Sequence, residues 1–207
     1  MSTQGVDIPS ELGLPIGTWN VDPSGSRLEF AVKTMWGLAT VKGRFERFEG
    51  LLEVGRDHAR GELTIEAASL ETGHAKRDTH LRSADFFDVS DHPTVSFVAT
   101  AITPRPGQDL TISGDLTVAG QVVRTQLPVR VTREEQGRLH LSTTVTVTRE
   151  QVGMTWNRGG MIRGAVQLTA ELELGPAARP AGDGADDGAV SADVDKRRVP
   201  VPQRSAG

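Results

Sequence analysis

The chain has 207 residues and a formal net charge of −4, with 23 Lys and Arg against 27 Asp and Glu. This length allows one domain with a substantial core, and the charge gives no electrostatic reason to expect nucleic acid as a partner. The absence of cysteine excludes disulfides, thiol nucleophiles and cysteine-ligated metals. No apolar run approaches the roughly 18–20 residues that cross a bilayer, and residues 1–11 lack the pattern of a secretory signal. We therefore expect a cytoplasmic protein without a membrane span.

Composition divides the chain into three parts. Residues 1–16 are punctuated by Gly and Pro without periodicity, which predicts a flexible N-terminal arm. Residues 17–174 carry strand patterns and predict one folded domain. In residues 175–207, 16 of 33 residues are Gly, Ala or Pro and none is aromatic. Such a segment cannot bury enough apolar surface to offset its ordering entropy, so we expect a disordered C-terminal tail.

Apolar and polar residues alternate with period two through most of the domain, which is typical of half-buried strands. Leu28, Phe30 and Val32, for example, alternate with charged or small residues. The pattern predicts strands at 19–21, 27–33, 62–66, 95–101, 110–118, 127–132, 139–148 and 166–174, and a bent pair across 41–54. Turn residues at 106–109 and 119–121 predict hairpins. We predict an all-β fold, a closed antiparallel up-and-down (lipocalin-like) barrel of about eight strands; a two-sheet sandwich is the alternative.

Small residues interrupt the apolar faces that would point into such a barrel. An eight-stranded barrel is just wide enough to be filled by side chains or to hold one small ligand. Small inward residues favour the second option, whereas a solid core with small residues at its tapered ends is the alternative. The residues concerned are Gly43, Ala99, Ala101, Gly114, Thr143, Gly164 and Ala170.

Residues 77–87 break the alternation and predict a short helical insertion. Arg77, Asp78 and His80 form a polar cluster that we expect to fix this insertion to the barrel through charge-assisted hydrogen bonds. The alternative is a catalytic pair in which His80 acts as base and Asp78 orients it. The histidines lack zinc-type spacing, and no phosphate loop or dinucleotide fingerprint is present, so neither a metal nor a cofactor is predicted.

Several segments together resemble the YceI-like family of polyisoprenoid-binding, lipocalin-like proteins. The most specific match is the insertion itself, Arg-Asp-x-His-Leu followed by Asp-Phe-Phe and His-Pro-x-x-x-Phe. The other matching segments are 19–30, 43–50, 69–73, 114–120 and 148–154. The resemblance covers about 155 residues, and it implies an antiparallel barrel around an elongated apolar cavity.

The resemblance also implies a long-chain ligand such as a polyisoprenoid, a quinone precursor or a fatty amide, and a possible homodimer. Gly25 and Thr34 stand where the family often has histidine. These two departures make a metal or catalytic site at the barrel mouth less expected. Many members of this family are exported, but residues 1–11 lack the pattern of a secretory signal, so the resemblance does not change the expected cytoplasmic location.

Aromatic and Met side chains adapt to a flexible hydrocarbon chain and exclude water from it. We therefore predict non-catalytic binding, sequestration or transport of a long-chain lipid or isoprenoid, with residues 35–42 and 153–161 as a moving gate. The alternatives are a lipid-acting hydrolase or isomerase that uses His80 and Asp78, and a fully packed interaction module. The predicted ligand-binding residues are Phe30, Val32, Trp36, Phe45, Ile65, Phe86, Phe87, Phe97, Leu116, Met154, Trp156 and Met161.

Overall fold

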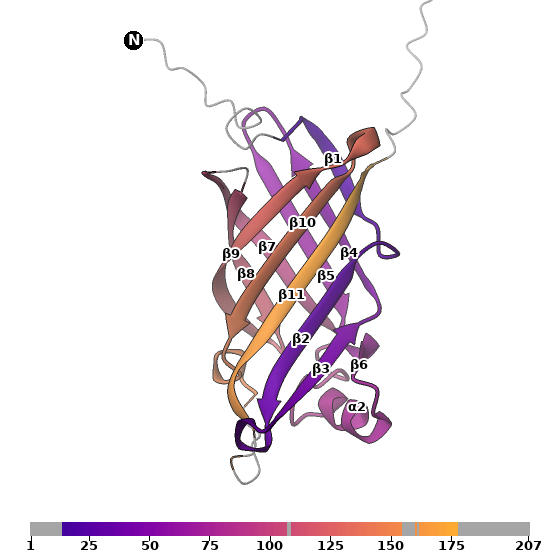
Figure 1. Cartoon of the computed structure of the whole chain (residues 1–207), viewed down its shortest axis with the longest axis vertical. Coiled ribbons are helices and arrows are strands. Elements are labelled where there is room, and N and C mark those ends of the chain that lie inside the picture. Colours follow the sequence, from indigo (N-terminus) through magenta and orange to yellow (C-terminus); the bar gives the residue numbers. More distant parts are fainter. Residues whose placement is uncertain (1–13, 107–108, 155–159, 161, 178–207) are drawn as a thin grey trace, which may run out of the picture. The chain divides into compact units, whose positions relative to one another are not determined.

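A computed structural model describes residues 14–106, 109–154, 160 and 162–177. Figure 1 shows long tilted strands that wrap into a barrel, with the short helix α2 (Ala75–Arg82) beside its lower part. The predicted barrel with a helical insertion is thereby confirmed. The strands are β1 (Gly17–Val21), β2 (Arg27–Thr34), β3 (Ala39–Phe45), β4 (Phe48–Val54), β5 (Ala59–Glu66), β6 (Leu70–Glu71), β7 (Thr94–Arg105), β8 (Asp109–Val118), β9 (Gln121–Arg133), β10 (Leu139–Val147) and β11 (Arg163–Pro176).

The sheet closes because β1 pairs with β4 on one side and with β11 on the other. The ring of antiparallel neighbours is β1, β4, β5, β7, β8, β9, β10 and β11. Strand β2 continues from β1 along the same edge of β11 and pairs with β3, which leads directly into β4. β1 with β2, and β3 with β4, thus act as two long bent strands. The fold is the predicted eight-stranded up-and-down barrel.

The bend between β1 and β2 has a local cause in Asp22 and the residues that follow it. The Asp22 carboxylate accepts a hydrogen bond from the Ser24 N–H at 3.0 Å, and the Asp22 carbonyl accepts one from the Ser26 hydroxyl at 2.7 Å. Pro23 cannot donate to a ladder. Such a turn interrupts the strand while the chain stays against β11.

Two clusters of buried residues lie in the barrel, one towards each end, and the partly buried Val21 and Leu172 pack against both. One cluster includes Leu14, Trp19 and Leu139, and we call the end of the barrel where it lies the plugged end. The indole Nε1 of Trp19 donates there to the carbonyl of Gly137 at 3.0 Å. The α2 end is centred on Phe45, Leu70 and other residues near the helix. A barrel with a continuous solid core would form one cluster, so this division points to unfilled space between the two.

The packed chain extends slightly beyond residues 17–174 at both ends. Leu14, which we expected in the flexible arm, is buried against the plugged end. Strand β11 continues to Pro176, and the N–H of Ala177 donates to the carbonyl of Thr18 at 2.8 Å. The rest of the predicted arm (1–13) and tail (178–207) lies outside the described residues.

The inward position predicted for Ala101 is wrong. A β-bulge shifts the register between Ala99, which pairs with Gly114, and Ala101, which pairs with Ser113. The extra residue in a bulge reverses the side-chain alternation that follows it. Ala101 is therefore exposed, and Ile102 packs towards the core instead.

Candidate ligand cavity

A hollow of about 430 Å³ lies inside the barrel between the two clusters. Its lining is mostly apolar and comes from the inner faces of the ring strands, including Leu63, Leu116 and Leu168. These side chains are only half-buried although they point away from the outer surface. Inward-facing leucines in a solid core would be fully buried, so their residual exposure is to the hollow. The volume lies within the range of small-molecule binding sites.

The hollow ends against a solid layer at the plugged end. Leu14, Trp19, Val54 and Leu139 are buried there and do not line the hollow. Leu52, Ile112 and other residues of the same cluster form its floor. This layer makes the plugged end the apolar base of the cavity.

Aromatic and sulfur-containing side chains line the cavity at the α2 end. Phe86 and Met154 are buried, and Phe87 is half-buried. Phe45 and Phe87 meet edge to face with ring centroids 5.8 Å apart, and the ring of His80 stands edge to face on Phe86 at 5.1 Å. Edge-to-face pairs hold rings in defined positions. The insertion that carries α2 therefore supplies part of the cavity wall at this end.

The polar side chains Arg77, His80 and Arg149 also reach the cavity at this end. His80 Nε2 lies 2.9 Å from a carboxylate oxygen of Asp85. Arg149 is buried, its Nη1 donates to the Met154 carbonyl at 3.4 Å, and its Nη2 lies 3.3 Å from a carboxylate oxygen of Glu150. The cavity thus has an apolar base, and the few basic side chains that reach it do so at the α2 end.

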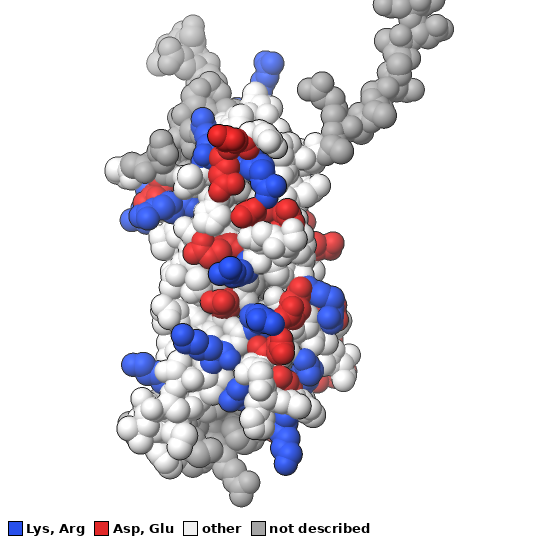
Figure 2. Space-filling model, turned by 45° about the vertical axis from the view of Figure 1, so that its right-hand side comes forward, with Lys and Arg blue, Asp and Glu red and all other residues white. Residues whose placement is uncertain are grey.

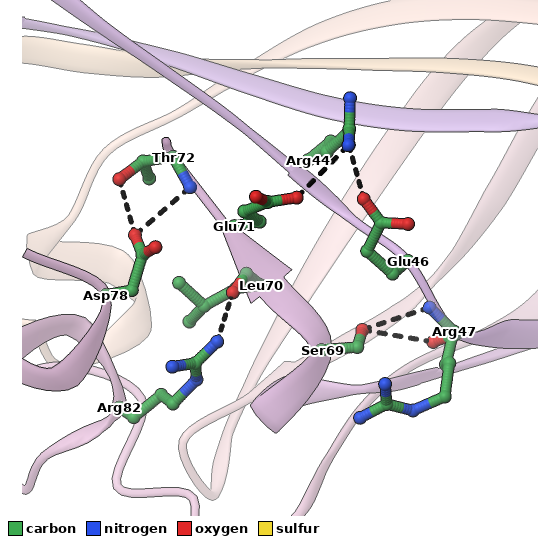
Figure 3. Close-up of polar contacts among 9 residues, drawn as sticks. All are labelled: Arg44, Glu46, Arg47, Ser69, Leu70, Glu71, Thr72, Asp78 and Arg82. Carbon is green, nitrogen blue, oxygen red and sulfur yellow. Dashed lines mark hydrogen bonds and ion pairs between the residues drawn. The ribbon is translucent and has the colours of Figure 1, made fainter. Parts of the chain in front are cut away.

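Helix α2 is held to the barrel through Thr72. Figure 3 shows the carboxylate of Asp78 facing the backbone N–H of Thr72, which donates at 3.0 Å, and the Thr72 hydroxyl, which also donates to it. Arg77 Nε donates to the same hydroxyl at 2.7 Å, and Arg77 Nη2 donates to the Thr72 carbonyl at 2.8 Å. These contacts are charge-assisted. They support the structural role expected for Arg77 and Asp78.

The end of α2 is fixed in the same way to the segment that leads into β6. Arg82 donates to the carbonyl of Ala68 at 2.9 Å and, as Figure 3 shows, to that of Leu70 at 2.5 Å. On the other side of β6, Arg44 pairs with Glu71 at 3.1 Å and with Glu46. The hydrogen bond from Arg44 lowers the pKa of the Glu46 carboxyl. The insertion is thus joined to β3 and β6 by backbone and side-chain contacts.

One detail of the alternative catalytic prediction is wrong. We considered Asp78 as the group that orients His80, but Asp78 is buried and bonded to Thr72. Asp85 lies beside the His80 ring instead. The i, i+2 spacing on a helix points Asp78 and His80 in different directions, because helical neighbours lie three or four residues apart.

Nine of the twelve predicted ligand-binding residues line the cavity. Trp36 does not; it lies exposed in the turn between β2 and β3. Trp156 and Met161 lie outside the described residues, as does most of the predicted gate segment 153–161. Segment 35–42 forms the β2–β3 turn and the first half of β3. The nine lining residues are Phe30, Val32, Phe45, Ile65, Phe86, Phe87, Phe97, Leu116 and Met154.

The small inward residues fall into two groups. Ala99, Thr143 and Ala170 line the cavity directly. Gly43 and Gly114 are instead covered by the rings of Phe30 and Phe97, which occupy the space that a side chain would need. The surroundings of Gly164 are outside the described part of the chain. Small residues therefore enlarge the hollow both by their own size and by accommodating these rings.

Sequence reasoning missed several lining residues. Leu63, Val145, Val166 and Leu172 lie on the inner faces of their strands and were predicted only as apolar faces. Alternation tells which face is inward but not how deep along a strand the hollow begins. For Arg149 the sequence contains one weak indication of a place at the end of the barrel: the residue follows a strand of alternating Thr and Val and precedes a turn.

Neither a metal site nor a spanning helix is found in the part of the chain that the structure describes. Within residues 14–106, 109–154, 160 and 162–177, no group of three His, Asp or Glu residues could hold a metal ion. Among the same residues, no helix has the length and apolar character needed to cross a bilayer.

Known proteins share both the sequence pattern and the fold. The sequence profile of the YceI-like domain matches residues 19–174. A UPF0312 protein of Vibrio cholerae is 33% identical over 106 residues, which are 49% of this chain and 56% of that protein. The chain thus spans about half the length of the curated relatives it matches.

Solved structures share the fold at lower identity. BcnA of Burkholderia cenocepacia superposes with a TM-score of 0.68 at 21% identity, over 74% of this chain and 98% of BcnA. A polyisoprenoid binding domain from Saccharophagus degradans gives a TM-score of 0.61 at 16% identity, over 78% of this chain and 99% of that domain. The profile match spans the whole barrel from Trp19 to Leu174, and the chain belongs to the YceI-like family.

Proposed function

We propose that the protein binds one long-chain hydrophobic molecule in the barrel without catalysing a reaction on it. The observation that carries this proposal is the apolar hollow of about 430 Å³ between two separate core clusters. A structural neighbour is named as a polyisoprenoid binding domain, which supports a ligand of the same class here. A polyisoprenoid, a quinone precursor or a fatty amide would each suit such a cavity.

Apolar burial supplies enough free energy for this function. Each methylene group removed from water contributes about 0.8 kcal/mol. A chain of about ten buried carbons therefore supports micromolar affinity after the cost of ordering the ligand. The lining of Leu, Val, Phe and Met needs no further chemistry to hold it.

The lining also suggests how the ligand is oriented. The base of the cavity at the plugged end is apolar, whereas Arg77, His80 and Arg149 lie at the α2 end. Burying a polar headgroup against the apolar base would cost several kcal/mol, about 2–7 for an unpaired amide or hydroxyl. We place the hydrocarbon tail towards Leu52 and Ile112 and the headgroup near α2.

Organic extraction of the purified full-length protein, followed by lipid mass spectrometry, tests the proposal. We expect one class of long-chain lipid, in a stoichiometry of no more than one per chain by native mass spectrometry. The delipidated protein should take up the same lipid again. A protein that carries no lipid, and that binds no long-chain probe after delipidation, would refute the function.

A lipid-acting enzyme is the second candidate, favoured by His80, which lines the cavity and pairs with the exposed Asp85. The variant His80→Ala separates the two functions. It should keep binding within about twofold if the protein only binds, because His80 contributes one of many lining contacts. Release of a chemically altered lipid by the natural protein but not by His80→Ala would establish the enzyme instead.

The fully packed interaction module is not favoured, because the core is divided by the hollow. Transport, a cytoplasmic location and a homodimer stay predictions from the sequence and from the resemblance. Fractionation of cells would test the location, and analytical ultracentrifugation would test the homodimer.

A further inference from the structure

The turn between β2 and β3 carries apolar side chains on the outside of the barrel. Met35 is 53% exposed, Trp36 is 55% exposed and Leu38 is 87% exposed. We call residues 35–38 the apolar tip. Single exposed apolar residues need no explanation, but several large ones gathered at one turn mark an interaction site.

The backbone of the apolar tip is held in an unusual conformation. Met35, Trp36 and Gly37 have φ angles of 49°, 57° and 93°, all in the left-handed region. Non-glycine residues rarely adopt this region, and each such residue costs of order 1–3 kcal/mol. Two costly residues in succession are unusual for a turn that only joins two strands. In this conformation the Met35 and Trp36 side chains are both more than half exposed.

The charged residues nearest to the apolar tip in the sequence are both basic. Residues 31–43 contain Lys33 and Lys42 and no acidic residue. Both lysines are exposed, and neither forms an ion pair with another described residue. Figure 2 shows Lys, Arg, Asp and Glu intermingled over this face of the barrel wall.

The apolar tip also adjoins the cavity. Val32 and Thr34 at the end of β2, and Val41 on β3, line the hollow directly behind the turn. Strand β3 pairs with β2 along its whole length but with β6 only at Arg44 and Phe45, so the edge of residues 39–43 that faces away from β2 has no paired strand among the described residues. A surface that contacts the apolar tip would therefore lie next to one end of the cavity.

We propose that the apolar tip docks onto the surface of an anionic lipid bilayer, from which the cavity receives or returns its ligand. This inference rests on the proposed lipid-binding function and adds the partner. Trp and Met side chains insert at the boundary of headgroups and acyl chains, while nearby lysines are attracted to anionic lipids. Exposed apolar residues flanked by lysines match both features of such a surface.

Co-sedimentation with vesicles tests the proposal. The full-length protein is mixed with vesicles of phosphatidylcholine and phosphatidylglycerol, or with phosphatidylcholine alone. We expect binding to the anionic vesicles that weakens with added salt. The variant Met35→Ser, Trp36→Ser, Leu38→Ser should lower the partition coefficient at least about tenfold, and Lys33→Glu, Lys42→Glu should lower it about as much.

Matched changes elsewhere on the barrel serve as controls. Ile16→Ser with Val98→Ser removes exposed apolar side chains away from the apolar tip. Arg56→Glu with Arg60→Glu alters the net charge as the double lysine variant does, but near the β4–β5 turn at the plugged end. Both control variants should bind vesicles like the natural protein.

Three outcomes overturn the docking proposal: no sedimentation of the natural protein, tip variants that sediment as it does, or control variants that lose binding equally. A natural protein that dimerises, with tip variants that become monomers, would identify a second copy as the occupant instead. Binding of a long-chain fluorescent probe is measured on every variant. If probe binding persists while vesicle binding is absent, only the docking proposal fails; if the natural protein binds no probe, the cavity function fails.

Discussion

The ring of Phe30 on β2 fills the space in which a side chain at Gly43 on β3 would lie. Phe97 covers Gly114 on the other side of the barrel in the same way. A ring that lies over a glycine of the neighbouring strand follows the wall of a barrel and extends less into its interior. These two pairs let large aromatic residues line the cavity without filling it.

Replacing Gly43 by alanine should therefore destabilise the barrel. The added Cβ atom would overlap the Phe30 ring and crowd Thr72. Overpacking of this kind costs about 1–3 kcal/mol of unfolding free energy. Urea denaturation of the purified variant, compared with the natural protein, measures the loss.

Gly61→Ala is the matched control for this prediction. Gly61 lies within a strand as Gly43 does, but it lines the cavity, and a Cβ atom there would lie at an ordinary 3.5 Å from Ala99 Cβ. Alanine is favoured over glycine within a strand by about 0.5–1 kcal/mol, so this variant should keep or raise stability. Equal midpoints for Gly43→Ala and Gly61→Ala would contradict the account of Phe30.

Most of the fold follows from simple alternation. The inner faces of β8, β10 and β11 are regular enough that period two alone predicts strand positions and the barrel. The bulge before Ala101 could not be predicted, because an extra residue in a strand leaves no mark in composition. The same limit applied to the bend at Asp22, where only the pairing shows that β1 and β2 share one edge of β11.

The site was less predictable than the fold. Phe30 and Phe97 line the cavity as predicted, because the alternation of side chains along a strand decides which residues face inward. Trp36 was expected to bind ligand because it interrupts the strands, but a positive φ turns it outward. Direction within a turn depends on backbone angles that a sequence pattern does not give.

Asp78→Ala should loosen α2 from the barrel. It removes the buried carboxylate that accepts hydrogen bonds from both the Thr72 N–H and the Thr72 hydroxyl. An unsatisfied buried donor costs about 1–3 kcal/mol. The unfolding free energy in urea should fall by that amount, and hydrogen exchange in residues 75–82 should become faster.

Asp85→Ala is the comparison for Asp78→Ala on the same insertion. Asp85 is half exposed and pairs with His80 at the surface, so its loss should cost less than about 1 kcal/mol. If both substitutions change stability equally, the Thr72 contacts do not hold the helix.

His58 at the β4–β5 turn should make stability depend on pH. Hydrogen bonds to Asp57 at 2.9 Å and Glu53 at 3.2 Å raise the pKa of His58 above its ordinary value of 6.5. Because the folded state holds the proton more tightly, the stabilisation is fully present below pH 6.5 and is lost as the pH rises through the folded pKa.

Melting curves of the natural protein and of His58→Ala test this pH dependence. The natural protein should have the higher Tm at a pH just below 6.5, and the difference should shrink in the alkaline range. A difference that stays constant, or that grows as the pH rises, would contradict the role given to the two carboxylates.

Two alanines of β7 provide the most direct test of a ligand inside the barrel. Ala99 lines the cavity, whereas Ala101, just past the bulge, is exposed on the outer face. Each is replaced by tryptophan, and binding of a long-chain fluorescent probe to the two delipidated proteins is measured by titration. The account predicts that Ala99→Trp weakens binding at least about tenfold, since the indole takes the place of the buried hydrocarbon, and that Ala101→Trp binds like the natural protein. Equal affinities for the two folded variants would mean that the ligand does not occupy the hollow.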